Sequence, residues 1–137
     1  MEKYINIVKK LIKYDIEEEW FEFKTNQTEP YAVGEYISAL SNAAAFHNGD
    51  FAYLVWGIHD QSHEIIGTKF NFRQNIHKEP FEHFLARQIT PDILFSFHEI
   101  KIENKRVVVL EIPAASKIPT SFDMKRYLRI GSIVKLI

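Results

Sequence analysis

The segment that most constrains the fold is residues 51–58. It reads Phe-Ala-Tyr-Leu-Val-Trp-Gly-Ile, with an apolar side chain at nearly every position. A strand with one solvated face alternates apolar and polar residues, whereas a strand covered on both faces is apolar throughout. The pattern therefore predicts a central strand buried on both faces, in a chain whose 137 residues suffice for one domain with a substantial core.

Three other segments repeat apolar residues at helical spacing, and we predict helices at 2–13, 31–46 and 76–89. Further strands are predicted at 19–24, 64–67, 93–102, 106–112, 126–130 and 133–136. This order of elements predicts an α+β domain in which a mixed, largely antiparallel sheet packs against about three helices. Within the second helix, Ser41 and Asn42 interrupt the apolar residues, and we expect them to bond to helix carbonyls or to tie down a loop.

The composition excludes several classes of protein. The chain has no cysteine, which excludes disulfides and thiolate metal sites. No apolar run approaches the roughly 20 residues that cross a bilayer, so we expect a cytoplasmic protein without membrane contact. The net charge of −1 argues against a general nucleic-acid binder. However, residues 101–137 hold eight Lys or Arg against three acids. This excess predicts a basic face, unless the charges are spread over separate surfaces.

Glu22 and Lys24 are the residues that point most directly to chemistry. They stand two apart within the predicted strand 19–24, so their side chains lie on one face, while Phe21 and Phe23 point the other way. A carboxylate beside a lysine suits a metal-dependent phosphodiesterase, because the acid holds a divalent cation and the lysine meets the phosphate charge. A solvent-facing salt pair on an edge strand gives the same pattern.

Several short motifs occur in a fixed order along the chain. They are Glu22-Phe23-Lys24, the run Gly34-Glu35-Tyr36-Ile37-Ser38-Ala39-Leu40-Ser41-Asn42, Val55-Trp56-Gly57-Ile58-His59-Asp60, Ile66-Gly67-Thr68, Ile89-Thr90-Pro91 and Tyr127-Leu128-Arg129-Ile130-Gly131-Ser132. Taken together they resemble the Schlafen-type AlbA-like domain, also called a divergent AAA-associated domain, over about residues 17–132. The family usually shows a Gly-Gly pair before its central strand, and Gly49-Asp50 stands there in this chain.

The resemblance implies a Schlafen AlbA-like fold and two alternative functions. Bacterial relatives are regulator-like proteins that carry this domain at the N-terminus, where it binds nucleic acid. Residues 1–137 would then be a single AlbA-like domain of a longer transcriptional regulator. The similar domain of animal Schlafen proteins is an endoribonuclease for transfer RNA. Its three acids fall on Glu17, Glu22 and Asp60, which would bind Mg²⁺ or Mn²⁺ with Lys24 beside them.

Glu17 is the weakest member of this acidic set. If the strand began at residue 17, Glu17 would point away from Glu22, so it can join only if residues 17–19 are not extended. Glu18 would point to the same side of an extended strand as Glu22 and could take the place of Glu17. Alternatively, Glu17, Glu18 and Glu19 form a solvated acidic run.

Phosphate contacts without cleavage are the simpler expectation. The candidates are Lys24, Lys125, Arg126, Tyr127 and Arg129, with Tyr127 and Arg129 on the same side of their strand. Tyr127 could instead belong to the core, with Arg129 as an exposed strand charge. We therefore carry three functions forward: a nucleic-acid-binding domain for DNA or RNA, a Mg²⁺- or Mn²⁺-dependent endoribonuclease, and a protein-interaction or dimerisation module, the last of which would allow a homodimer.

Overall fold

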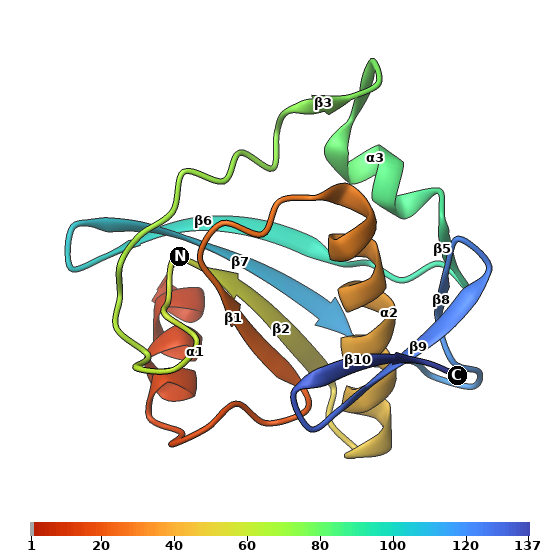
Figure 1. Cartoon of the computed structure of the whole chain (residues 1–137), viewed down its shortest axis with the longest axis horizontal. Helices are drawn as coiled ribbons and strands as arrows, with labels where there is room; N and C mark the ends of the chain where they lie inside the picture. The colour runs from red at the N-terminus through yellow and green to blue at the C-terminus, as the bar shows by residue number, and fades with distance from the viewer. Residues whose placement is uncertain (1) are drawn as a thin grey trace.

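The central sheet has four strands in the order β1-β2-β7-β6 (Figure 1). The structure is a computed structural model that describes residues 2–137. The strands are β1 (Phe21–Lys24), β2 (Phe51–Trp56), β7 (Lys105–Pro113) and β6 (Ser96–Ile102). β1 runs parallel to β2, and the other two pairings are antiparallel. The prediction of an α+β domain with a mixed, largely antiparallel sheet is confirmed.

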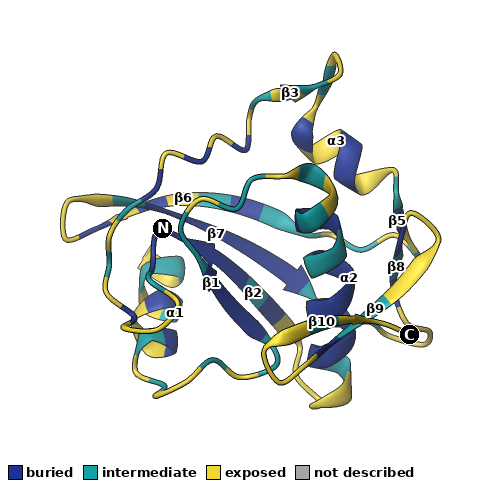
Figure 2. Cartoon of the chain, in the orientation of Figure 1, coloured by how far each residue is buried: buried dark blue, intermediate teal, exposed yellow. Residues whose placement is uncertain are grey.

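The two faces of this sheet are covered by different helices. In β2, Leu54 and Trp56 belong to the core cluster that contains α2 (Pro30–Phe46), whereas Val55 belongs to the cluster that contains α1 (Glu2–Ile12). β2 is therefore buried on both sides from Leu54 to Trp56, as Figure 2 shows by its colour. The sequence predicted this burial from the continuous apolar run.

A second sheet packs against α2, mainly through β9. Its order is β10-β9-β8-β5, with β10 at Ile133–Leu136, β9 at Lys125–Ile130, β8 at Ser121–Phe122 and β5 at Ile89–Thr90. Buried polar side chains of α2 hold it: Ser38 Oγ donates to Thr120 O at 2.9 Å, and Asn42 Nδ2 donates to Tyr127 O at 2.7 Å. Ser41 Oγ donates to Pro113 O at 2.8 Å, so these residues tie down neighbouring segments.

Gly34 allows β8 to approach α2 closely. A Cβ built at this position would lie 2.1 Å from Cε1 of Phe122. Phe122 is buried against the helix, so the absence of a side chain at residue 34 sets the distance between the helix and the second sheet.

Two predicted elements were wrong in extent. The helix predicted over 76–89 is only α3 (Phe81–Ala86), because β3 (Asn75–Ile76) and β4 (Glu79–Pro80) form a hairpin before it. The turn residues of that hairpin, His77 and Lys78, have φ angles of 50° and 71°, which a helix cannot contain. The strand predicted over 64–67 is a single bridge between Ile58 and Ile65. Among residues 2–137, no helix is long and apolar enough to cross a membrane.

Candidate functional site

β1 divides its side chains between the two faces of the central sheet. Phe21 and Phe23 are fully buried in the cluster that contains α1. Glu22 and Lys24 point to the opposite face, and Lys24 Nζ lies 3.5 Å from Glu22 Oε2. The same-face prediction is therefore confirmed, but the pair is not a solvent-facing one, because only 7% of the Glu22 side chain is exposed.

Glu22 and Glu17 share one guanidinium, which comes from Arg129 on β9. Arg129 Nε donates to Glu22 Oε1 at 2.7 Å, and Arg129 Nη2 donates to Glu17 Oε1 at 2.9 Å. The Arg129 side chain is 0% exposed. We call Glu17, Glu22 and Arg129 the acid–arginine cluster. The sequence predicts that Arg129 contacts phosphate or is an exposed strand charge; in this structure its guanidinium is not exposed and is paired with two carboxylates.

The chain before β1 brings Glu17 into this cluster. Residues 17–20 belong to no strand, residues 19 and 20 form a turn, and β1 begins only at Phe21. The amide of Phe23 donates to Glu17 Oε2 at 2.9 Å, which turns the carboxylate toward the strand. Glu17 could join Glu22 only if the strand did not already include residue 17, and the structure meets this condition.

The other two acids of this run hold the turn between β9 and β10. The carbonyl of Glu18 accepts from Arg129 Nη1 at 2.6 Å, and the carboxylate of Glu19 accepts from the Gly131 amide and contacts His47 Nε2 at 2.8 Å. The acidic run is therefore not merely solvated, because it anchors the C-terminal hairpin to the start of β1.

The buried carboxylates are electrostatically coupled. Burial, together with the nearby Glu22 charge, raises the pKa of Glu17 from 4.5 to about 7, although the Phe23 amide and Arg129 oppose the rise. Burial disfavours the charged ammonium of Lys24, but Tyr36 and the Glu22 carboxylate outweigh that cost and raise its pKa above the usual value. Lys24 therefore carries its charge at neutral pH, with its Nζ 4.9 Å from the centre of the Tyr36 ring.

The predicted acids and lysine do meet at one place. A pocket of about 720 Å³ is lined by Glu17, Glu22, Lys24 and Asp60, together with Asp15, Ile16, Tyr36, Gln61, Gly131 and Ser132. We call it the acidic pocket, because four carboxylates line it. Asp60 follows β2, its side chain is 62% exposed, and its Oδ1 lies 3.7 Å from His59 Nδ1.

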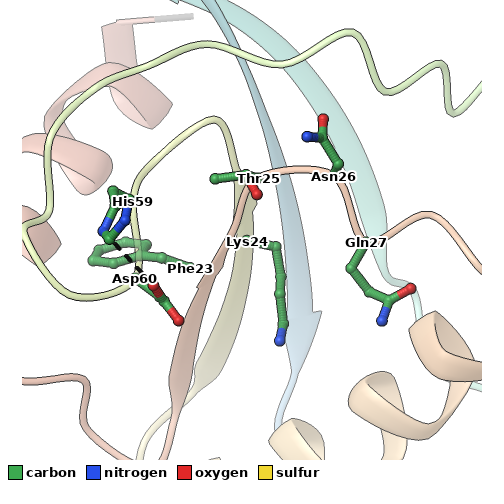
Figure 3. A pocket seen from close by; sticks show the side chains of 7 residues that line it. All are labelled: Phe23, Lys24, Thr25, Asn26, Gln27, His59 and Asp60. Carbon is green, nitrogen blue, oxygen red and sulfur yellow. Dashed lines mark ion pairs between the residues drawn. The ribbon is translucent and has the colours of Figure 1, made fainter.

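A second pocket of about 410 Å³ adjoins the acidic pocket and shares Lys24 and Asp60 with it (Figure 3). We call it the loop pocket, since Thr25, Asn26 and Gln27 of the loop after β1 line it with Phe23 and His59. In Figure 3 the Asn26 side chain points away from Lys24 and Gln27. Both pockets thus open beside the carboxyl ends of the parallel strands β1 and β2, where α/β sheets commonly bind ligands.

The carboxylates do not fit a divalent metal in this arrangement. Within residues 2–137, no three His, Asp or Glu side chains converge as metal ligands would. One oxygen each of Glu17 and Glu22 is bonded to Arg129, and the second Glu17 oxygen is bonded to the Phe23 amide. A cation already lies between the two acids, so a metal bound there would face the guanidinium charge.

The remaining predicted binding residues lie elsewhere. Lys125 and Arg126 are exposed at the start of β9 and line a pocket of about 540 Å³ that shares no residue with the acidic or loop pocket. Tyr127 is half-buried against the core, and its hydroxyl is 3.5 Å from Glu35 Oε2. Lys101, Lys105 and Arg106 lie in the β6–β7 hairpin, at the opposite end of the molecule from the β8–β9 hairpin that carries Lys125 and Arg126 (Figure 1), so the basic residues of 101–137 do not form one face.

Sequence reasoning missed Tyr36 and Asp15. Tyr36 falls within the run of residues that resembles the family, yet nothing in a helical segment indicates that its ring will meet a lysine from a strand. Asp15 lies in the connection between α1 and β1, where no periodic pattern places side chains.

Comparison with known proteins supports the fold and gives the family. Residues 17–137 match the family described as Schlafen, AlbA_2. The crystal structure of the DIP2311 protein from Corynebacterium diphtheriae is similar over 99% of this chain, with a TM-score of 0.60 and 16% identity. This chain spans only 26% of that protein's chain.

The solution structure of the N-terminal domain of a RecG-related protein from Nitrosomonas europaea is also similar. It matches 93% of this chain and 88% of its own length, with a TM-score of 0.57 and 18% identity. No curated protein sequence matches the chain significantly. Because the family match extends from the segment before β1 to the last residue of the sequence, the chain belongs to the Schlafen AlbA_2 family.

Proposed function

We propose that this domain binds nucleic acid at the junction of the acidic and loop pockets, as the nucleic-acid-binding part of a regulator-like protein. The observation that carries the proposal is the position of Lys24. Its ammonium stands at the carboxyl end of β1, where two pockets meet, and it remains charged there. The family membership and the likeness to a domain of a protein named for its relation to a DNA helicase support the same conclusion.

The two pockets suit different parts of a nucleotide. The loop pocket offers the Lys24 ammonium and the polar side chains of Thr25, Asn26 and Gln27, which are groups that contact phosphate and sugar. The acidic pocket repels phosphate, and its carboxylates instead accept hydrogen bonds from hydroxyl and amino groups. A bound strand would therefore turn its phosphates toward the loop and its sugars or bases toward the acids.

Binding and its salt dependence test this proposal. Labelled single-stranded DNA, duplex DNA and structured RNA are titrated with the protein at several salt concentrations, and anisotropy gives each dissociation constant. We expect the affinity to fall as the salt concentration rises. The salt slope is the slope of the logarithm of the binding constant against the logarithm of the salt concentration, and Lys24→Gln should reduce its magnitude by about 0.7–0.9, the value of one phosphate contact. Lys9→Gln is the matched control, because Lys9 lies exposed on α1, away from both pockets.

Two results would overturn the proposal. One is the absence of binding to all three nucleic acids at low salt, and the other is binding that does not depend on salt. The same mixtures with Mn²⁺, scored for cut products, test the endoribonuclease alternative, with Glu22→Gln as the inactive control. We do not propose that activity, because one oxygen each of Glu17 and Glu22 is bonded to Arg129.

A further inference from the structure

A third pocket, of about 470 Å³, lies beyond the loop pocket, between the segment after β2 and the start of β7. It is lined by Asn26, Ile66, Gly67, Thr68, Lys69, Lys105 and Arg106. We call it the lysine pocket. Three of its seven lining residues are cationic and none is acidic, so its charge is opposite to that of the acidic pocket.

Two of the three cations are available to a ligand. Arg106 is already committed, since its Nε donates to Glu99 Oε1 at 2.9 Å and its Nη1 to Thr68 O at 3.2 Å. Lys105 Nζ donates to the neutral Ile65 carbonyl at 3.0 Å, which leaves its charge uncompensated. Lys69 and Lys105 are both exposed, and neither forms an ion pair with any residue in the part of the chain that the structure describes.

Backbone and hydroxyl contacts fix the walls of this pocket. The Thr68 amide donates to Arg106 O at 2.9 Å, and its hydroxyl donates to Thr25 O at 2.9 Å. The Gly67 amide donates to Gly57 O at 2.9 Å, with Gly67 at a φ of 83°. The segment that carries Lys69 is therefore joined both to β7 and to the loop after β1, so its backbone needs little reorganisation when a ligand binds.

The three pockets follow one another. The lysine pocket shares Asn26 with the loop pocket, and the loop pocket shares Lys24 and Asp60 with the acidic pocket. The charge of the lining residues changes along this series, from positive in the lysine pocket to negative in the acidic pocket. A phosphodiester strand that reaches Lys24 thus finds further cations in one direction only, because carboxylates line the other.

We infer that Lys69 and Lys105 contact backbone phosphates of the same nucleic-acid strand that the loop pocket binds. This inference rests on the proposed function and extends its site away from the acids. It also assigns phosphate binding to the β6–β7 end of the molecule rather than to Lys125 and Arg126, whose pocket shares no residue with the series.

Two double variants with equal charge changes test the inference. Lys69→Gln/Lys105→Gln removes the lysines of the pocket, and Lys125→Gln/Arg126→Gln removes two exposed cations at the other end. With single-stranded DNA or RNA, the first pair should lower the salt slope by about 1.4, twice the value of about 0.7 for one single-strand contact. That change corresponds to an affinity loss of about 25-fold at 0.1 M salt, relative to 1 M salt where the electrostatic contribution vanishes. The second pair should leave both quantities near the wild-type values.

The outcomes separate this inference from the proposed function. If the wild-type protein binds and the Lys69/Lys105 variant keeps the wild-type slope, the inference is overturned while the function stands. If the control pair lowers the slope equally, only total charge matters and the inference is again overturned. If the wild-type protein does not bind, the proposed function itself fails. Lys69→Arg/Lys105→Arg should retain the slope, which separates loss of charge from damage to the fold.

Discussion

Arg129 gives the most direct test of the acid–arginine cluster. In Arg129→Met the buried carboxylates of Glu17 and Glu22 lose the guanidinium that bonds to both of them. Removing one partner of a buried ion pair costs about 3–5 kcal/mol, because the carboxylates left behind stay buried without the cation that bonds to both of them. Domains of this size have an unfolding free energy of about 5–15 kcal/mol, so the variant should lose a large part of its stability.

Urea denaturation followed by circular dichroism measures this loss. Arg126→Met is the matched control, since Arg126 lies exposed on the same strand and should change the unfolding free energy by no more than about 0.5 kcal/mol. Adding Glu17→Gln and Glu22→Gln to Arg129→Met should restore most of the lost stability, because the cost comes from the unpaired charges. A loss below about 1 kcal/mol in Arg129→Met, or no recovery in the triple variant, would refute this reasoning.

Three further predictions follow from other features. The raised pKa of Glu17 means that the folded state binds its proton more tightly than the unfolded state, so wild-type stability should fall as the pH rises from 4.5 to about 7. The pKa shift limits this loss of unfolding free energy to about 3 kcal/mol, and solvent screening reduces it to about 1–2 kcal/mol. Urea denaturation at a series of pH values measures the loss, and Glu17→Gln should remove it. Gly34→Ala should lower stability by about 1–3 kcal/mol because its methyl group meets Phe122, and normal stability would show that β8 can shift. Asn42→Ala should cost about 1–3 kcal/mol by leaving the Thr120 amide without its acceptor, and Ser116→Ala, at an exposed position, is its control.

The backbone arrangement followed from local patterns where those patterns were strong. The unbroken apolar run over 51–58 predicted burial on both faces, and the alternation of Phe21, Glu22, Phe23 and Lys24 predicted which side chains share a face. The helix predicted over 76–89 was too long. A periodic pattern does not show that a tight hairpin and Pro80 interrupt it, so the helix begins only at Phe81.

The acid–arginine cluster could be predicted only in part. Strand parity placed Tyr127 and Arg129 on one side. In the structure the Tyr127 hydroxyl lies 3.5 Å from Glu35 Oε2 of α2, and the Arg129 guanidinium bonds Glu22 and Glu17. Parity does not reveal what that side meets, because Glu22 and Glu17 precede Arg129 by 107 and 112 residues. A buried guanidinium and an exposed one have the same local sequence signature. The nearby lysine pocket was missed for a similar reason, since Lys69 and Lys105 are brought together by a loop without periodicity.

The late position of Arg129 has a consequence for biosynthesis. When a ribosome has made residues 1–100, Glu17 and Glu22 have already left it, but Arg129, which bonds to both in the folded domain, has not been made. Until the β9–β10 hairpin has emerged, the two carboxylates stay solvated only while water reaches β1, the edge strand of the central sheet. This domain therefore cannot complete its native state before Arg129 has left the ribosome, and a product that stops short of that residue exposes an incomplete, negatively charged edge.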